Sequence, residues 1–237
     1  MDRNVKAALV LGGFIALGLA ILGSTLGSSA IRFKEYERVV SVKGLSEREV
    51  PANIAIWPIG FSGADADLSA LYSKLEADVD RIVDFLETRG FEREEITVAA
   101  PEVTDKLAQR YGGNEPVQLR YTASQVITVY TERIDEVRAA RNDLAELGKQ
   151  GIAFGGDNFQ RTEYLFTELN DIKPGMIEEA TRKAREVAER FAADSNSRLG
   201  KIKTANQGQF TVSDRDMNTP HIKKVRVVST IEYYLSD

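Results

Sequence analysis

The 237-residue chain contains no cysteine, and this absence excludes several kinds of chemistry at once. Without a thiol the protein has no disulfide, no cysteine nucleophile and no zinc site built on cysteine. It also lacks the residue to which a bacterial lipoprotein attaches its lipid. The absence of free thiols is compatible with an oxidising compartment.

Histidine is nearly absent as well, since His221 is the single one in the chain. Acid–base and nucleophilic catalysis usually draw on histidine, cysteine, lysine or carboxylates with perturbed pKa values. His221 follows Pro220 at the start of an expected strand, and no G-x-S-x-G elbow accompanies it, so we interpret it as a surface or turn residue. The signatures H-E-x-x-H, G-x-x-x-x-G-K-[ST] and G-x-G-x-x-G are missing too. We therefore expect no enzymatic activity, no catalytic residue and no cofactor.

One fragment has the composition of a metal site. Asp214-Arg215-Asp216-Met217-Asn218 carries the alternating oxygen ligands of the first half of a calcium loop. Thr219 stands where that loop needs glycine, and Val225 stands where it needs the bidentate glutamate. We interpret the fragment as a polar turn and expect no metal site.

Pairs of neighbouring acids leave one catalytic hypothesis open. Asp65 with Asp67, or Glu94 with Glu95, could flank a glycosidic bond, which is the basis of a carboxylate-hydrolase alternative. Acids at such positions are more often helix caps and solvating charges.

The balance of charge argues against nucleic acid as a partner. The formal net charge is −5 and the pI is near 5.2, whereas phosphate binding needs a basic face. Two basic runs, at residues 182–185 and 223–226, are interleaved with acids and are expected to be solvated surface.

The N-terminus carries the one long apolar run. Residues 7–26 contain no charge, and about 20 helical residues span roughly 30 Å of hydrocarbon. Arg3 and Lys6 precede the run and favour a cytoplasmic N-terminus. We expect a cytoplasmic stub and single-pass signal-anchor over 1–30, a stem over 31–38 and an exported domain over 39–237, in the bacterial inner membrane with the domain in the periplasm. A cleavable signal peptide is the alternative, because Ser28-Ser29-Ala30 offers small residues for cleavage.

Small residues recur at every fourth position of this run. Such a strip lets helix backbones approach closely and would serve self-association, but it also arises by chance in a segment with many small residues. The positions are Ala8, Gly12, Ala16, Ala20 and Ser24.

The remainder predicts an α/β protein of the α+β kind. We expect two strand-helix-strand-strand units with mainly antiparallel sheets, over 49–132 and 151–235, with a further helix between them. The expected strands are 39–43, 49–61, 95–106, 117–132, 151–166, 201–212 and 222–235. The expected helices run from Asp65 or Asp67 to Gly90, over 134–147 before Gly148, and from Asp171 and Pro174 to Gly200.

Strand aromatics such as Trp57 are expected in the core. Tyr111 is the exception, because it lies on the Gly-rich connection 109–116, which reads as a long hairpin tip. We regard Tyr111 as a candidate contact with a partner.

Two stretches resemble the bacterial SIMPL-domain family, also described as periplasmic immunogenic proteins. They are SVKGLSEREVPANIAIWPIGF at 41–61 and ATRKAREVAERFAADSNSRLGKI at 180–202, and the resemblance extends over about 39–235. It implies an exported α/β domain that assembles into rings or larger oligomers, with links to envelope or oxidative stress. The family has no agreed enzymatic activity and supplies no catalytic residue to transfer.

The leading functional hypothesis is a membrane-anchored periplasmic scaffold or assembly protein that forms a homo-oligomer. The alternative is a binding module that captures a small ligand, a peptide or an envelope polymer in grooves between the two units. The carboxylate hydrolase is the second alternative.

Overall fold

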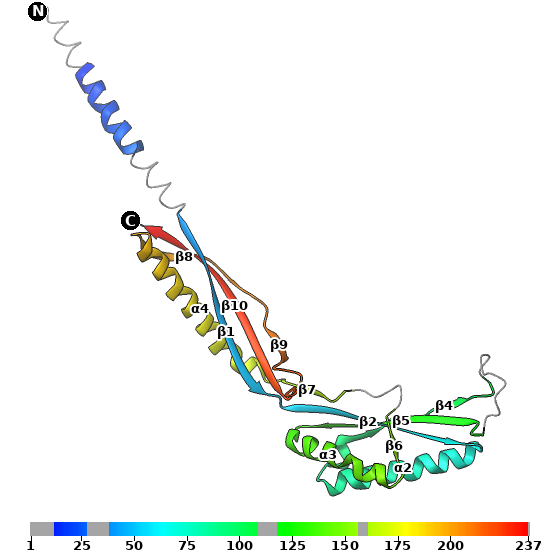
Figure 1. Ribbon diagram of the computed structural model, residues 1–237. Helices are drawn as coiled ribbons and strands as arrows, with labels where there is room; N and C mark the ends of the chain where they lie inside the picture. The colour runs from blue at the N-terminus through cyan, green and yellow to red at the C-terminus, as the bar shows by residue number, and fades with distance from the viewer. Residues whose placement is uncertain (1–11, 28–37, 109–117, 156–160, 237) are drawn as a thin grey trace, which may run out of the picture. The chain divides into compact units, whose positions relative to one another are not determined.

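The computed structural model describes residues 12–27, 38–108, 118–155 and 161–236 (Figure 1). The chain divides into two compact units, each built on a mainly antiparallel sheet with helices packed on it, so the predicted α+β class is confirmed. The terminal unit comprises Met1–Glu47, Lys173–Thr211 and Arg226–Asp237. The central unit comprises Arg48–Ile172 and Val212–Val225.

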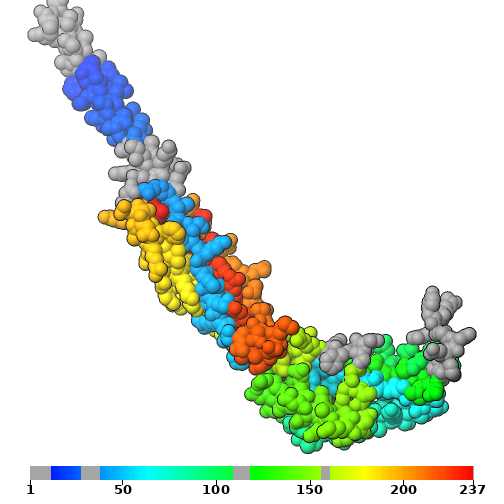
Figure 2. All heavy atoms as spheres, in the orientation of Figure 1, coloured from blue at the N-terminus to red at the C-terminus, as the bar shows by residue number. Residues whose placement is uncertain are grey.

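The sheet of the terminal unit has the order β1-β10-β8 and is covered by one long helix, α4 (Leu169–Asp194). Its strands are β1 (Val39–Pro51), β8 (Arg198–Gln207) and β10 (Ile222–Ser236), with β9 (Thr211–Asp214) also paired to β10. Alanine at every fourth position gives α4 a flat buried face: Ala180, Ala184, Ala188 and Ala192. This face contacts Val42 of β1, and the two elements lie side by side although they are far apart in sequence (Figures 1 and 2).

The sheet of the central unit has the order β3-β5-β2-β6. Its long strands, β2 (Ile54–Asp65) and β5 (Tyr121–Thr131), pair antiparallel from Ala55↔Thr131 to Asp65↔Tyr121. The short strands are β3 (Ile96–Val98) and β4 (Glu102–Asp105) on β5, and β6 (Ala153–Phe154) and β7 (Glu163–Leu165) on β2. The helices are α2 (Leu68–Thr88), α3 (Ile134–Lys149) and the short 3₁₀ helix η1 (Arg93–Glu95).

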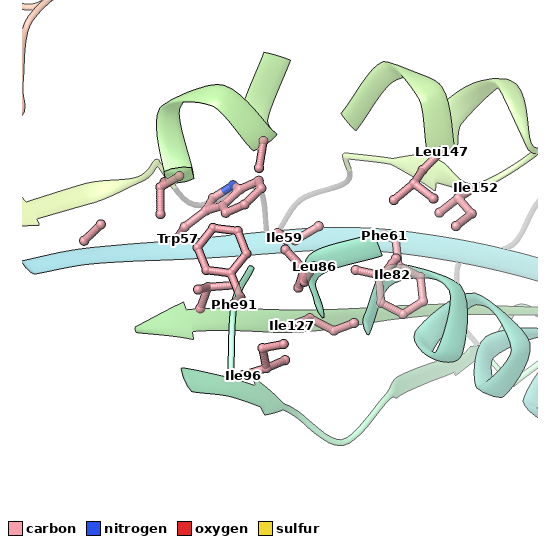
Figure 3. Close-up of a cluster of buried hydrophobic side chains, with 14 of the residues drawn as sticks. Trp57, Ile59, Phe61, Ile82, Leu86, Phe91, Ile96, Ile127, Leu147 and Ile152 are labelled. Atoms are coloured by element: carbon pink, nitrogen blue, oxygen red, sulfur yellow. The ribbon is translucent and has the colours of Figure 1, made fainter. Parts of the chain in front are cut away.

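The main core of the central unit lies between this sheet and its two helices. Trp57 is 2% exposed, and its ring centroid lies 6.2 Å from that of Phe91. Figure 3 shows both side chains within this core. Alternate residues of β2 and β5 meet apolar positions of α2 and α3 there, which is the period of two expected for a sheet with one covered face. The core position predicted for Trp57 is therefore confirmed, whereas the same prediction was wrong for Tyr130 of β5, which is 53% exposed.

The predicted start and stop of α2 are confirmed. Asp67 is the N-cap, and its carboxylate accepts a hydrogen bond from the Ala70 N–H at 2.8 Å. Gly90 follows the helix with a φ of +92°, a conformation that favours glycine.

The predicted bounds of α4 were partly wrong. The helix begins at Leu169, before Asp171, and Pro174 lies inside it. It ends before Asn196, whose φ is +52°, whereas Gly200 lies within β8. The apolar period of the helix also predicts Val187 and Phe191 on its inner face, but they are exposed, at 38% and 55%, because the alanine row is the surface that meets the sheet.

Other breaks were also misplaced. β1 continues through Gly44 and ends only at Pro51, and α3 includes Gly148 and stops ahead of Gly151, whose φ is +95°. The stretches 95–106 and 201–212 were each expected as one strand; the first forms β3 and β4, and the second divides between β8 and β9.

The expected division into consecutive halves differs from the observed pairing. Residues 151–166 do not supply a strand for the sheet under α4; within the described residues they form β6 and β7, which pair with β2. In that sheet β10 pairs with β1, from the start of the domain, on one side and with β8 on the other. The central unit is thus inserted between segments of the terminal unit, an arrangement set by long-range pairing that local periodicity does not reveal.

The N-terminal helix is described over residues 12–27. In the described ranges, no helix has both the length and the apolar character needed to cross a membrane. Ala8 and the hairpin tip with Tyr111 lie outside the described residues.

Candidate functional site

Three of the four acids that suggested a hydrolase, Asp65, Asp67 and Glu95, have structural partners. Asp67 caps α2, and the Asp65 carboxylate accepts the Asp67 N–H at 3.0 Å. Glu95 accepts the Thr131 hydroxyl at 2.6 Å and the Glu92 N–H at 2.8 Å, which closes the start of η1. These carboxylates hold helix and strand ends together, as the capping interpretation predicted.

The basic run at 182–185 is paired along α4, as expected of solvated surface. Arg182 contacts Glu186 at 2.9 Å and Arg185 contacts Glu189 at 3.1 Å, each one helical turn ahead. Such exposed i,i+4 pairs contribute about 0.3–0.5 kcal/mol each. In the second run the prediction of solvated surface was wrong for Lys223, which is buried at 7% exposed and contacts Asp214.

A polar pocket of about 300 Å³ lies in the central unit and concentrates cationic and amide side chains. Three elements distant in sequence form it: the polar side of α3, the strand β7 and the turn before β10. Its lining residues are Arg138, Arg141, Asn142, Tyr164, Asn218, Pro220 and His221.

The first wall of the pocket is the polar side of α3. Arg138, Arg141 and Asn142 are spaced i, i+3 and i+4, so they share one side of the helix. Val137 and Leu147 lie on another side and are buried in the core, which fixes the rotation of the helix.

The second wall is a turn closed by Asp216. Its carboxylate accepts the N–H groups of Asn218 and Thr219, both at 2.8 Å, and the Thr219 hydroxyl. The N–H of Arg215 donates to the Ile222 carbonyl at 2.9 Å across the base of the turn. The interpretation of the calcium-like fragment as a polar turn is therefore confirmed.

His221 lies where this turn meets the sheet of the central unit. Its carbonyl accepts the Ala52 N–H at 2.8 Å, and its ring lies 6.0 Å from that of Tyr164 at an interplanar angle of 66°. Tyr164 is 3% exposed and belongs to β7, which pairs with β2, so the back of the pocket is a buried part of the sheet.

The fixed positive charge of the pocket comes from the two arginines. Burial lowers the pKa of His221, and the nearby Arg138 lowers it further, so its imidazole is neutral at pH 7. Arg138 contacts Asp135 at 3.0 Å. Within the described parts of the chain Arg141 contacts no carboxylate, which leaves its guanidinium free to meet a ligand.

Sequence reasoning placed His221 in a turn, and the structure confirms this. It missed the arginines beside it. The polar side of α3 could be recognised from its period, but no local signal told which segment would face it.

A larger pocket, of about 600 Å³, lies at one end of β2 and β5. It is lined by hydroxyl and small side chains, with Lys74 and Glu102 of opposite charge. This arrangement favours neither an anionic nor a cationic ligand.

Four of the five small residues proposed for self-association lie in the described helix 12–27: Gly12, Ala16, Ala20 and Ser24. All are exposed. The Ser24 hydroxyl donates to the Ile21 carbonyl at 2.9 Å, so it is satisfied within the helix.

Comparison with known proteins gives one family. No curated protein matches the chain. The family described as SIMPL, protein of unknown function (DUF541), matches residues 40–230. The match spans segments of both units and includes the two stretches on which the resemblance rested. The chain therefore belongs to the SIMPL family, as its sequence predicted.

Proposed function

We propose that this SIMPL protein is a membrane-tethered scaffold of the bacterial cell envelope that acts by assembly and binding and not by catalysis. The observation that carries the proposal is the helix at 12–27, whose large apolar side chains are all exposed: Phe14, Ile15, Leu17, Leu19, Ile21, Leu22 and Leu26. A helix that is apolar all round is unfavourable in water and is stable in lipid or inside a protein.

The flanking charges support an inner-membrane location with the folded units in the periplasm. The uncharged run begins at Ala7, and Arg3 and Lys6 lie just ahead of it. Positive residues favour the cytoplasmic side of a span. The link to envelope or oxidative stress stays a prediction from the family resemblance.

Membrane fractionation tests the tether. We expect the full chain to stay in the membrane pellet after an alkaline wash, and protease added to spheroplasts to digest both units. Leu19→Arg should shift the chain to the soluble fraction, because an arginine at the centre of a span disfavours insertion by about 2.5–3.5 kcal/mol. The matched control is Val212→Arg, at a 41% exposed position of β9. A wild-type chain that the wash releases would contradict the tether, and release of a shortened chain would establish the cleavable alternative.

Self-association is supported by exposed aromatic side chains on both units. Phe191 of α4 is 55% exposed and Tyr130 of β5 is 53% exposed. Aromatic residues of this kind are enriched where proteins contact one another.

Light scattering of the full chain in mild detergent tests the assembly. We expect a defined multiple of the 26.2 kDa protomer. If the double substitution Ala16→Leu with Ala20→Leu lowers the mass, the subunits contact one another through the small-residue side of the helix at 12–27. If Phe191→Ser lowers the mass, they contact one another through α4. A strictly monomeric mass across micromolar concentrations would contradict the scaffold.

A binding module is the second candidate, and the pocket beside α3 favours it. Every residue that lines this pocket belongs to the central unit. A ligand that binds only the folded state raises the melting temperature, so thermal-shift screening with envelope components measures it. Stabilisation by none of them would remove the support for this candidate.

A further inference from the structure

The pocket beside α3 has the chemistry of an oxyanion site. Arg138 and Arg141 each present a planar fork of donors that matches phosphate and carboxylate oxygens. Asn142 and Asn218 add amide donors, and His221 adds a ring N–H. From these groups we infer that the pocket binds the phosphate or carboxylate group of a small ligand, an assignment that rests on the binding-module function proposed above.

The two acids beside the pocket, Asp135 and Asp216, make other contacts and do not pair with Arg141 in the described parts of the chain. The Asp216 carboxylate is engaged by Thr219, Asn218 and Arg215, so it does not compete for the pocket arginines. Asp135 pairs with Arg138 from a carboxylate that is 87% exposed.

The volume limits the size of the ligand group. About 300 Å³ is at the lower end of the range for small-molecule pockets, so a head group fits and a folded partner does not. The chain as a whole is acidic, with a net charge of −5. Binding of an anion therefore depends on this local cluster, because charges more than about 8–10 Å apart are screened at physiological salt. Screening also means that the affinity for the anion falls as the ionic strength rises.

The single histidine gives a direct probe of the site in the full chain. We would label histidine with ¹³C, hold the protein in a neutral detergent, and follow the only imidazole signal by NMR. The titrants are inorganic phosphate, acetate and, as a control at matched ionic strength, chloride.

We expect a saturable shift of the His221 signal with phosphate, with acetate or with both, and the stronger titrant identifies the preferred oxyanion. Bound anion should also raise the His221 pKa, because a negative charge favours the imidazolium against Arg138 and Arg215, with Asp135 and Asp216 unchanged. Arg141→Gln should weaken the affinity about tenfold, since it removes a charge-assisted hydrogen bond. The matched control is Arg182→Gln on α4, which should bind as the wild type does.

An equal response to chloride would overturn the inference, and so would an Arg141→Gln variant that binds like the wild type. Fluorescence of Trp57, the only tryptophan, verifies that each variant keeps the core of the central unit. Tether and assembly are measured separately by fractionation and mass, so a soluble or monomeric chain that still binds phosphate would contradict the scaffold alone.

Discussion

Gly44 of β1 lies directly against the backbone of Ala180 in α4. A β-carbon at position 44 would stand 1.8 Å from the Ala180 carbonyl oxygen and 2.6 Å from the Ala184 nitrogen. The obstructing atoms are backbone atoms of a helix, so they cannot move aside as a flexible side chain would. The alanine row of α4 and the glycine of β1 together set the spacing of helix and sheet in the terminal unit.

Gly44→Ala should therefore destabilise the terminal unit, by about 3 kcal/mol, the upper part of the usual range for overpacking. The readout is hydrogen exchange at α4 amides, because Trp57 fluorescence reports the other unit. Gly148→Ala is the control, at a helical position where a β-carbon meets nothing within 4 Å; it should stabilise α3 by about 0.4–1 kcal/mol. If the α4 amides of Gly44→Ala keep their hydrogen-exchange protection, the helix and the strand can move apart to make room for the methyl group.

Removing the cap of α2 should weaken the central unit. Asp67→Ala leaves the Ala70 N–H without its 2.8 Å acceptor, and loss of an N-cap costs about 1 kcal/mol. Urea unfolding followed by Trp57 fluorescence measures the change. Asp84→Ala, at an exposed interior position of α2, should be neutral or slightly stabilising. Equal effects of the two substitutions would contradict a capping role.

The titration of His221 should depend on Arg138. Its pKa is lowered first by burial and next by Arg138, with smaller opposing effects of Asp135 and Asp216. A base with a lowered folded pKa stabilises the fold above its ordinary pKa of about 6.5, and this contribution is lost as the pH falls through the folded value. We expect Arg138→Gln to raise the His221 pKa measured by NMR, and Arg182→Gln to leave it unchanged. An unchanged His221 pKa in Arg138→Gln would show that Arg138 lies too far from the imidazole to affect it.

Acid should open the turn before β10 only at very low pH. Hydrogen bonds from the Thr219 hydroxyl and from Arg215 hold the pKa of Asp216 well below its usual range. The stabilisation is complete above the ordinary aspartate pKa of about 3.9 and is lost as the pH falls through the lower folded value. The amide signals of Asn218 and Thr219 measure this between about pH 5 and 2. Asp216→Asn should remove the pH dependence, and a carboxyl that titrates near its ordinary value would contradict the hydrogen-bonded turn.

Several features could be predicted from the sequence because their causes are local. The bounds of α2 follow from a cap at Asp67, an apolar period of 3.6 and a glycine at position 90, all within one segment. The polar turn at 214–218 likewise follows from Asp216 and the residues next to it. Family membership could be recognised from two stretches, and the match over 40–230 confirms it.

Other features were decided only by tertiary structure. Whether β1 or residues 151–166 would pair beside β10 depends on contacts between segments more than a hundred residues apart, which no local pattern encodes. The same long-range pairing turns Gly44 from an expected strand break into a close-packing position. It also brings Arg141 of α3 to the turn that carries His221. The sequence by itself determined the bounds of α2 and the family of this protein. The pairing of distant strands decided which side chains share a pocket, because each wall comes from a separate part of the chain.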